Sequence, residues 1–276
     1  MAKILAVANQ KGGVGKTTTC VNLAASLAAT RKRVLMVDLD PQGNATMGSG
    51  IDKYELDLSV YDVLVHRRPV AEVKCVSEPG DFDVLPANSD LTAAEVELID
   101  TVHKEKRLKE ALEVVRDSYD YILVDCPPSL NMLTLNGLVA ADSVLIPMQC
   151  EYFALEGLTA LMDTIQRVAA SVNPELHVEG LLRTMYDPRN SLTNDVSAQL
   201  QQHFGDRLYR TVIPRNVRLA EAPSFGVPAI QYDPRSRGAQ AYLALAGEVI
   251  RRQTGELPAE VATLGAVLAD SFSEQE

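Results

Sequence analysis

Apolar residues gather into short uninterrupted runs along the chain, and longer stretches with helical spacing separate these runs. The runs lie at residues 4–8, 34–40, 82–86, 121–125, 143–148 and 177–182, and a further strand pattern ends at 214. Apolar runs without alternation are typical of strands that are buried on both faces, as in a parallel sheet. We therefore expect these segments to be the strands of one mostly parallel sheet.

Helical patterns fill the stretches between the runs. Residues 17–28 predict a mostly apolar helix, and residues 155–170 predict an amphipathic one. Shorter helices are expected at 58–65, at 89–100 with Ser89 or Asp90 as the N-cap, and at 107–116. Residues 130–141 are predicted to be helical or loop-like surface, residues 185–190 a loop, and a helix with small residues is expected after 232.

Strands that alternate with helices indicate right-handed βαβ units. The predicted fold is therefore α/β, a doubly wound, mostly parallel sheet with helices on both faces. No repeat, low-complexity tract or linker interrupts the pattern before Gly255, so residues 1–254 are expected to form one domain. Residues 255–276 contain acids but no Lys or Arg, and we expect them to form a flexible acidic tail.

The charge limits the classes of function. A formal net charge of −11 argues against a protein that covers nucleic acid through its overall charge, so any such contact must come from a local patch. Four arginines and no acid lie between Arg207 and Arg218.

The chain has no run of about 18 apolar residues, and its first residues enter a strand directly. We therefore expect neither a membrane span nor a signal peptide, and we expect a cytoplasmic protein.

The cysteines and histidines suggest no metal centre. Cys20, Cys75, Cys126 and Cys150 lack C-x-x-C spacing, and the histidines lack ligand spacing. We expect reduced, buried thiols. Cys126 follows a strand with a candidate catalytic residue, which leaves a functional role open, but no sequence neighbour would lower its pKa, and packing is favoured.

Residues 9–18 contain a Gly-rich loop between an expected strand and an expected helix, which is the context that a phosphate-binding loop requires. Gly12, Gly13 and Gly15 keep side chains away, so that successive backbone N–H groups can face an anion. The positive N-terminal end of the helix points at the same place. The loop is therefore predicted to bind phosphate.

Side chains at the end of this loop would add to the backbone contacts. Lys16 would reach the β- and γ-phosphates, the Thr17 hydroxyl would bind the Mg²⁺ between them, and Thr18 would lie close to the α-phosphate. The usual pattern G-x-x-x-x-G-K-[ST] is not met, because Gln10 stands where its first glycine belongs and Lys11 opens the loop.

Carboxylates follow two of the expected strands. Asp38 and Asp40 end one of them, and Asp125 ends another. Ligand sites of parallel sheets lie at the carboxyl ends of the strands, so we expect these side chains beside the phosphates. An apolar strand that ends in aspartate is the Walker B pattern, in which Asp125 would face Mg²⁺ and its water shell.

The segment Lys-Gly-Gly-Val-Gly-Lys-Thr-Thr resembles the deviant Walker A motif of the ParA/MinD group of P-loop NTPases. The residues after 38 resemble the D-x-D-P-Q-G segment of that group. Residues 209–226 and 232–242 resemble the chromosomal ParA/Soj branch, and the resemblance covers residues 1–253. It implies that Lys11 reaches the ATP of a dimer partner, that Asp40 orients the attacking water, and that Asp38 lies near the metal.

The resemblance thereby implies ATP and Mg²⁺ as cofactors and assigns roles by position. The nucleotide would contact Lys11, Gly12, Gly13, Val14, Gly15, Lys16, Thr17 and Thr18, with Pro214 and Asn216 near the adenine. Lys11, Lys16 and Asp40 would be catalytic, and Thr17, Asp38 and Asp125 would hold the metal.

Arginines are the candidate contacts to DNA, because they neutralise and hydrogen-bond phosphates. Arg189 and Arg218 match positions that the ParA/Soj branch uses for non-specific DNA binding, and Arg215 is a plausible neighbour. Charge alone is equally compatible with weak surface ion pairs to Asp187, Glu221 or Asp233.

The resemblance implies an ATP-dependent chromosome- or plasmid-partitioning protein. Its ATP-bound homodimer would bind double-stranded DNA non-specifically on the nucleoid, and hydrolysis, stimulated by a ParB/Spo0J-like centromere-binding partner, would release it. One alternative is a MinD-like positioning ATPase on membranes, which the tail without Lys or Arg does not favour. Another is a redox enzyme like the nitrogenase iron protein, which needs cluster-ligating cysteines.

Overall fold

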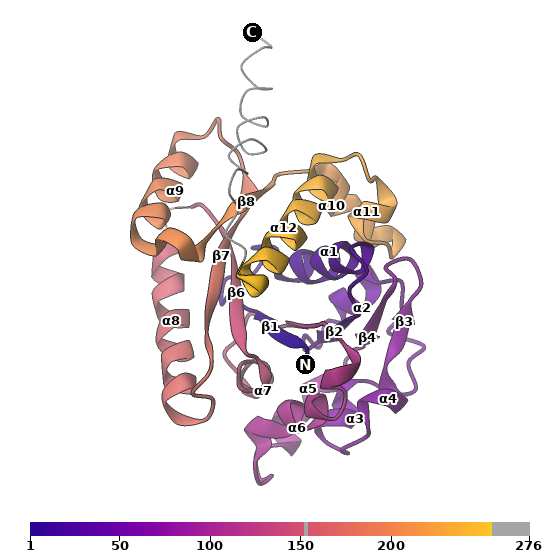
Figure 1. The fold of residues 1–276 in the computed structure, drawn as a ribbon. Helices are drawn as coiled ribbons and strands as arrows, with labels where there is room; N and C mark the ends of the chain where they lie inside the picture. The colour runs from indigo at the N-terminus through magenta and orange to yellow at the C-terminus, as the bar shows by residue number, and fades with distance from the viewer. Residues whose placement is uncertain (152–153, 256–276) are drawn as a thin grey trace.

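The computed structural model describes residues 1–151 and 154–255. In this part of the chain, eight strands form one sheet in the order β3-β4-β2-β5-β1-β6-β7-β8 (Figure 1). Neighbouring strands run parallel except β3, which is antiparallel to β4. The strands are β1 Lys3–Val7, β2 Val34–Asp38, β3 Cys75–Ser77, β4 Phe82–Leu85, β5 Tyr121–Asp125, β6 Ser143–Gln149, β7 His177–Tyr186 and β8 Leu208–Pro214.

Helices connect the strands in the alternating order that the sequence predicts. The α-helices are α1 Lys16–Ala29, α2 Asn44–Gly48, α3 Val60–Leu64, α4 Val70–Val73, α5 Leu91–Glu97, α6 Arg107–Glu113, α7 Met132–Ala140, α8 Ala154–Ser171, α9 Ser191–Phe204, α10 Val217–Glu221, α11 Ala229–Tyr232 and α12 Arg237–Thr254. Short 3₁₀ helices are η1 Lys104–Lys106, η2 Arg116–Ser118, η3 Gly205–Arg207 and η4 Ala222–Phe225.

Helices cover both faces of the sheet (Figure 1). Successive strand residues point to opposite sides, so Ile4 and Ala6 of β1 pack into one core while Leu5 and Val7 pack into the other. The first core includes residues of α3 to α9, and the second includes residues of α1, α2 and α10 to α12. This arrangement confirms the predicted doubly wound α/β fold.

The parallel register places the ends of the central strands side by side. Val7 of β1 pairs with Asp125 of β5, and Asp125 pairs with Asp38 of β2. The glycine loop that follows β1 therefore lies at the same edge of the sheet as both carboxylates. The loops after β7 and β8 lie at this edge as well, because those strands run in the same direction.

The sequence interpretation misses or misplaces several elements. It does not predict β3 or α9, and it ends β7 at 182 although the strand continues to Tyr186. The sequence of α9 is mostly polar, and Val196 and Leu200 are the large apolar side chains that it buries, which leaves a weak periodic signal. The sequence analysis is wrong in placing residues 130–141 on the surface, because α7 buries Leu133, Leu138 and Val139 in the core. Asp90 occupies the N-cap of α5, but its side chain makes no cap hydrogen bond.

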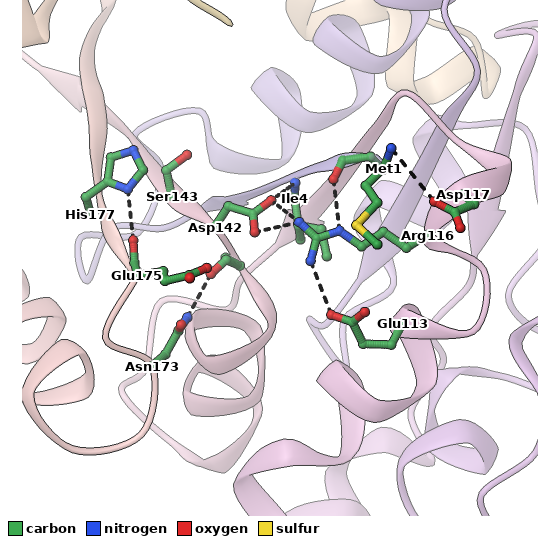
Figure 2. Close-up of polar contacts among 12 residues, drawn as sticks. Met1, Ile4, Glu113, Arg116, Asp117, Asp142, Ser143, Asn173, Glu175 and His177 are labelled. Atoms are coloured by element: carbon green, nitrogen blue, oxygen red, sulfur yellow. Dashed lines mark hydrogen bonds and ion pairs between the residues drawn. The ribbon is translucent and has the colours of Figure 1, made fainter.

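A polar network around Arg116 joins segments at the opposite edge of the sheet (Figure 2). Its guanidinium contacts Asp142 at 2.7 Å and Glu113 at 3.2 Å, and donates to the Ala2 carbonyl at 3.1 Å. The Asp142 carboxylate also accepts from the Ile4 amide at 2.8 Å. These contacts fix the start of β1 against η2 and the loop before β6, which is a structural role far from the glycine loop.

No helix in the residues that the structure describes combines the length and the apolar character needed to cross a membrane. The predicted acidic tail, residues 255–276, lies outside the described residues from 256 onward. The division of the chain into a domain of residues 1–254 and a tail therefore stays a prediction.

Candidate nucleotide-binding site

The backbone of the glycine loop has the shape of an anion cradle. Gly13 and Gly15 have φ values of +74° and +88°, a left-handed region that glycine adopts without a steric cost. Gly15 is the N-cap of α1 and provides no side-chain hydrogen bond to the helix. The first N–H groups of this 14-residue helix consequently face the loop, where an anion can accept from them.

Two side chains from outside the predicted motif hold the loop in place. Asn9 is buried, its amide donates to the Pro147 carbonyl at 2.8 Å, and its Oδ1 accepts from the Lys11 amide at 3.0 Å. The Thr184 hydroxyl at the end of β7 donates to the Val14 carbonyl at 2.8 Å. The sequence analysis gave neither residue a role; Asn9 opens the segment of residues 9–18, but nothing in the sequence connects Thr184 with the loop.

Lys16 and Asp125 are opposite charges buried below the loop. Lys16 is 7% exposed and its Nζ donates to the Lys11 carbonyl at 3.2 Å. Burial lowers the pKa of Lys16, and the charge of Asp125 acts in the opposite direction. A phosphate in the cradle would act as a counter-ion for the Lys16 ammonium group.

Asp125 is 1% exposed, and neither carboxylate oxygen accepts a hydrogen bond of good geometry among the described residues, although the Thr17 hydroxyl is close enough to lower its pKa. Burial raises the pKa of Asp125 well above its ordinary value, and the charge of Asp38 raises it further. A buried carboxylate with few hydrogen bonds is costly unless a cation accompanies it. Asp125 and the Thr17 hydroxyl are oxygen ligands of the kind that Mg²⁺ prefers, so the residues fit the predicted cation.

Asp38 is also buried, but its carboxylate is fully engaged. Its Oδ2 accepts from the Thr46 amide at 2.9 Å and the Thr46 hydroxyl at 2.8 Å, and its Oδ1 accepts from the Asp40 amide at 3.0 Å. Burial raises the pKa of Asp38 to about 6, although these hydrogen bonds act against the shift. This geometry favours a role in holding the loop of residues 40–46, and its role as a metal ligand stays a prediction.

Asp40 lines the cavity beside the glycine loop. Its Oδ1 accepts from the Gln42 amide at 3.0 Å, and the turn that follows uses Gly43 at a φ of +60°. A side chain at Gly43 would collide with the Ala87 carbonyl at 2.7 Å, so the turn packs closely against its surroundings. The predicted catalytic carboxylate thus stands on a fixed turn at the cavity wall.

The cavity itself has a volume of about 480 Å³ and extends from the glycine loop to the loops after β7 and β8. It is lined by the loop, Lys16 and the two threonines of α1, and also by Met185, Pro214, Arg215 and Asn216. The structure therefore brings most of the predicted nucleotide contacts to one cavity, and Val14 lies buried behind the loop. Asn216 caps α10 by accepting from the Leu219 amide at 3.3 Å.

Lys11 does not point into the cavity toward Lys16. Its Nζ forms an ion pair with Glu151 of the same chain at 2.6 Å, and the two side chains are 41% and 45% exposed. The sequence analysis did not consider Glu151, which follows β6 and is 140 residues away from Lys11 in the chain.

The predicted DNA contacts differ in their surroundings. Arg189 pairs with Asp187 at 3.0 Å, and Arg218 pairs with Glu221 at 2.7 Å and Asp233 at 3.4 Å. These are the surface ion pairs that the sequence analysis left open. Such pairs are weak at exposed sites and do not exclude a stronger anion. Arg215 is exposed and lines the cavity, and the pKa of Asp187 is lowered chiefly by its hydrogen bonds from Arg189 and further by the charge of Arg215. The role of the three arginines in DNA binding stays a prediction.

The thiols near the site are buried. Burial raises the pKa of Cys126, and the charge of Asp125 raises it further. Burial also raises the pKa of Cys20 well above its ordinary value. Thiols in such surroundings are unreactive, which supports a packing role for both residues.

Comparison with known proteins finds a matching family model and relatives with similar sequences. A protein-family model described as an AAA domain matches residues 2–178. The sporulation initiation inhibitor protein Soj of Bacillus subtilis is 55% identical over 90% of this chain and 98% of its own length. The chromosome partitioning protein ParA of Caulobacter vibrioides is 53% identical over 91% of this chain and 95% of its own.

Solved structures show the same fold. The structure of cobyrinic acid a,c-diamide synthase from Mycobacterium smegmatis with bound ADP and magnesium matches with a TM-score of 0.82 at 37% identity. The match covers 93% of this chain and 97% of that one.

The fold and the site define a P-loop NTPase with a deviant Walker A loop, since a parallel sheet presents a glycine loop with two lysines beside the Walker B aspartate. The relatives show to which family within this class the chain belongs. The chain belongs to the ParA/Soj family of chromosome-partitioning ATPases.

Proposed function

We propose that this chain is an ATP-driven partitioning switch whose ATP-bound homodimer binds double-stranded DNA without sequence preference. The observation that carries the ATPase part is that the glycine loop, Lys16 and the buried carboxylate of Asp125 meet at one edge of the sheet. The names of the relatives support the biological role: ParA of Caulobacter vibrioides is a chromosome partitioning protein, and the Treponema pallidum relative is a chromosome-partitioning ATPase.

The chemistry is hydrolysis of ATP to ADP and phosphate. The N–H groups at the start of α1 and Lys16 would hold the phosphates, and Asp40 would orient the water that attacks the γ-phosphorus. Thr17 and Asp125 would hold Mg²⁺, with Asp38 nearby, and the ion would supply positive charge between the phosphates. Lys11 and Lys16 would stabilise the negative charge that develops on the transferred group.

Dimer formation would require Lys11 to leave Glu151. In the ATP-bound dimer, Lys11 would contact the phosphates bound by the partner subunit. The Lys11–Glu151 ion pair is half-exposed, and such pairs contribute about 0.2–1 kcal/mol. Bound ATP carries more negative charge than one carboxylate and more than ADP, so the exchange would be most favourable when ATP is bound. Hydrolysis followed by departure of the phosphate would remove the charge of the γ-phosphoryl group and let Lys11 return to Glu151.

DNA binding would use Arg189 and Arg218, with Arg215 as a neighbour. They follow the neighbouring parallel strands β7 and β8, so both lie near the carboxyl edge of the sheet. Their ion pairs with carboxylates are exposed, and DNA phosphates can replace those partners. A dimer would double the number of arginines on one surface, and salt dependence would follow from the release of counterions.

The proposal includes a partner and a location. A ParB/Spo0J-like centromere-binding protein would stimulate hydrolysis, and binding to DNA would place the ATP-bound form on the nucleoid. It also keeps the division into an ATPase domain of residues 1–254 and an acidic tail.

Two alternatives have less support. A MinD-like membrane ATPase is less well supported because the relatives at 53–55% identity are named ParA and Soj, whereas the MinD of Pyrococcus furiosus matches at 25%. A redox enzyme with a metal cluster would need grouped ligands. In residues 1–151 and 154–255, no three His, Cys, Asp or Glu side chains are grouped to hold a metal.

The experiment that tests the proposal is binding of random-sequence duplex DNA with ATP, with ADP and without nucleotide, over a series of salt concentrations. Wild type, Lys16→Ala and Arg218→Glu are compared, with Arg68→Glu as a matched exposed arginine whose ion pair with Glu72 is far from the site in sequence. We expect binding that requires ATP, weakens with salt and is lost in the first two variants but not in Arg68→Glu. Binding that is equal with ADP, or unaffected by Arg218→Glu, would contradict the proposal.

A further inference from the structure

Arg218 contacts a carboxylate on each of two sides. Its Nη1 lies 2.7 Å from Glu221, which ends the same helix α10, and its Nε lies 3.4 Å from Asp233, which directly follows α11. Helices α10 and α11 lie side by side, so the two carboxylates reach Arg218 from different elements (Figure 1). The guanidinium group that DNA would use is therefore already paired in the DNA-free chain.

Glu221 is itself held in place by an aromatic pair. The Tyr232 hydroxyl donates to the Glu221 carboxylate at 3.2 Å, on the same oxygen that accepts from Arg218. The Tyr232 ring stacks on Phe225, with the ring centroids 5.0 Å apart and 28° between the planes. The carboxylate of Glu221 is thus fixed beside Arg218 by contacts from a second helix.

The ion pair between Arg218 and Glu221 is still open to an incoming anion. The side chains of Arg218, Glu221 and Asp233 are 49%, 38% and 36% exposed. An exposed ion pair shifts an equilibrium by only about 1.4- to fivefold, so DNA phosphate can displace it. A phosphate that binds Arg218 must replace Glu221 and then lies close to the displaced carboxylate.

We propose that Glu221 competes with DNA phosphate for Arg218 and thereby limits the DNA affinity of the ATP-bound dimer. The inference rests on the proposed DNA binding and adds a residue that sets its strength. Each subunit of the dimer has one such pair, so removal of the carboxylate charge should raise the DNA affinity by about two- to thirtyfold. The gain should shrink as the salt concentration rises, because salt screens exposed charges.

The test is binding of the full-length protein to random-sequence duplex DNA with ATP and Mg²⁺ at low and at higher salt. Glu221→Gln keeps the shape of the side chain and removes its charge. Glu72→Gln is the matched control, because it changes the net charge equally at an exposed acid that pairs with Arg68. We expect the stated gain in Glu221→Gln alone. ATP affinity should stay as in wild type, since Glu221 does not line the nucleotide cavity.

A double-mutant cycle shows whether Glu221 acts through Arg218. Arg218→Gln is compared with the Arg218→Gln/Glu221→Gln double variant at low salt, where electrostatic affinity for DNA is highest. Most of the gain from Glu221→Gln should be absent in this background, because the group that Glu221 holds is gone. A gain of the same size as in wild type would show that Glu221 repels DNA without holding Arg218, and would overturn the inference.

The outcomes also separate this inference from the proposed function. Unchanged DNA affinity in Glu221→Gln, or an equal gain in Glu72→Gln, overturns the role of Glu221 while ATP-dependent DNA binding stands. If wild type does not bind DNA with ATP, the proposed function is refuted and the role of Glu221 with it.

Discussion

At the scale of single residues, Asp125 shows that the site is built for a ligand and not for stability. Its carboxylate is buried, and burial raises its pKa more than the Thr17 hydroxyl and the charge of Lys16 lower it. At pH 7 the folded chain is destabilised whether Asp125 is charged or takes up a proton. Asp142, by contrast, is held by Arg116 and the Ile4 amide.

We predict that Asp125→Asn stabilises the nucleotide-free protein by about 1–3 kcal/mol, because it removes the ionisable group and keeps the shape. The same variant should lose Mg²⁺-dependent ATP hydrolysis. Thermal unfolding and a phosphate-release assay measure the two effects. Asp142→Asn is the matched control and should lower stability by about 1 kcal/mol. A destabilised Asp125→Asn protein would contradict this account of the carboxylate.

Asn9 allows a second test, because another buried asparagine makes a similar set of contacts elsewhere. Asn9 is 7% exposed and makes two hydrogen bonds that fix the glycine loop. Asn173 is 4% exposed, donates to the Leu138 and Ala141 carbonyls and does not line the cavity. The two side chains differ in what they position.

We predict that Asn9→Ala and Asn173→Ala both lose about 1–3 kcal/mol of stability, since each removes buried hydrogen bonds. Asn9→Ala alone should weaken ATP binding, by about tenfold, because the loop is no longer fixed in the shape of the cradle. Urea unfolding and titration with ATP provide the measurements. Equal ATP affinity in the two variants would show that Asn9 does not position the loop.

The residues of the site divide into those that the sequence predicts and those that it does not. The glycines, Lys16 and Asp125 are found because each stands directly at the end of a recognisable strand or loop. Thr184 and Glu151 contact the loop only because β6 and β7 are brought beside β1 by the sheet. Contacts of this kind depend on the order of the strands in the sheet, which the spacing of residues along the chain does not reveal.

At the scale of elements, strand β8 forms the edge of the sheet and α12 protects it. Glu248 of α12 accepts from the Arg210 and Thr211 amides, both at 2.9 Å, and from Arg252 at 3.0 Å. Burial alone would raise the pKa of Glu248, but these hydrogen bonds outweigh it and the pKa is lowered. N–H groups of an edge strand are thereby kept from pairing with another chain.

We predict that Glu248→Gln lowers stability by about 1–2 kcal/mol at pH 7. Because the folded pKa lies below the unfolded one, the contribution of the carboxylate is complete above the unfolded pKa of about 4.3 and is lost as the pH falls through the folded value. The difference from wild type should therefore shrink in urea unfolding below pH 4. Glu110→Gln, which breaks an exposed pair with Arg67, should change stability by less than about 0.5 kcal/mol at either pH.

The elements themselves were predictable to different degrees. Strands β1, β2, β5 and β6 are uninterrupted apolar runs, so their burial on both faces can be read from the sequence. The short β3 carries no such run, and Val76 within it is 63% exposed. The mostly polar α9 gives a similarly weak signal. Edge and surface elements bury few side chains, and their positions are decided by neighbours that are distant in the chain.

At the scale of the whole molecule, the central claim is that ATP decides the assembly state. The net charge of −11 opposes association with DNA and with a second copy, so a specific attraction must overcome it. In the structure Lys11 is held within its own subunit by Glu151. ATP bound to a partner subunit would provide the competing negative charge, and hydrolysis would remove it.

Sedimentation velocity tests this claim most directly, with wild type, Asp40→Ala and Lys11→Ala in Mg²⁺ with either ATP or ADP. Titration with ATP first confirms that each variant binds nucleotide. We predict that Asp40→Ala sediments as a dimer with ATP, because it cannot hydrolyse it, that Lys11→Ala remains a monomer with ATP, and that every protein is a monomer with ADP. A dimer of Lys11→Ala with ATP, or a wild-type dimer with ADP, would contradict the account.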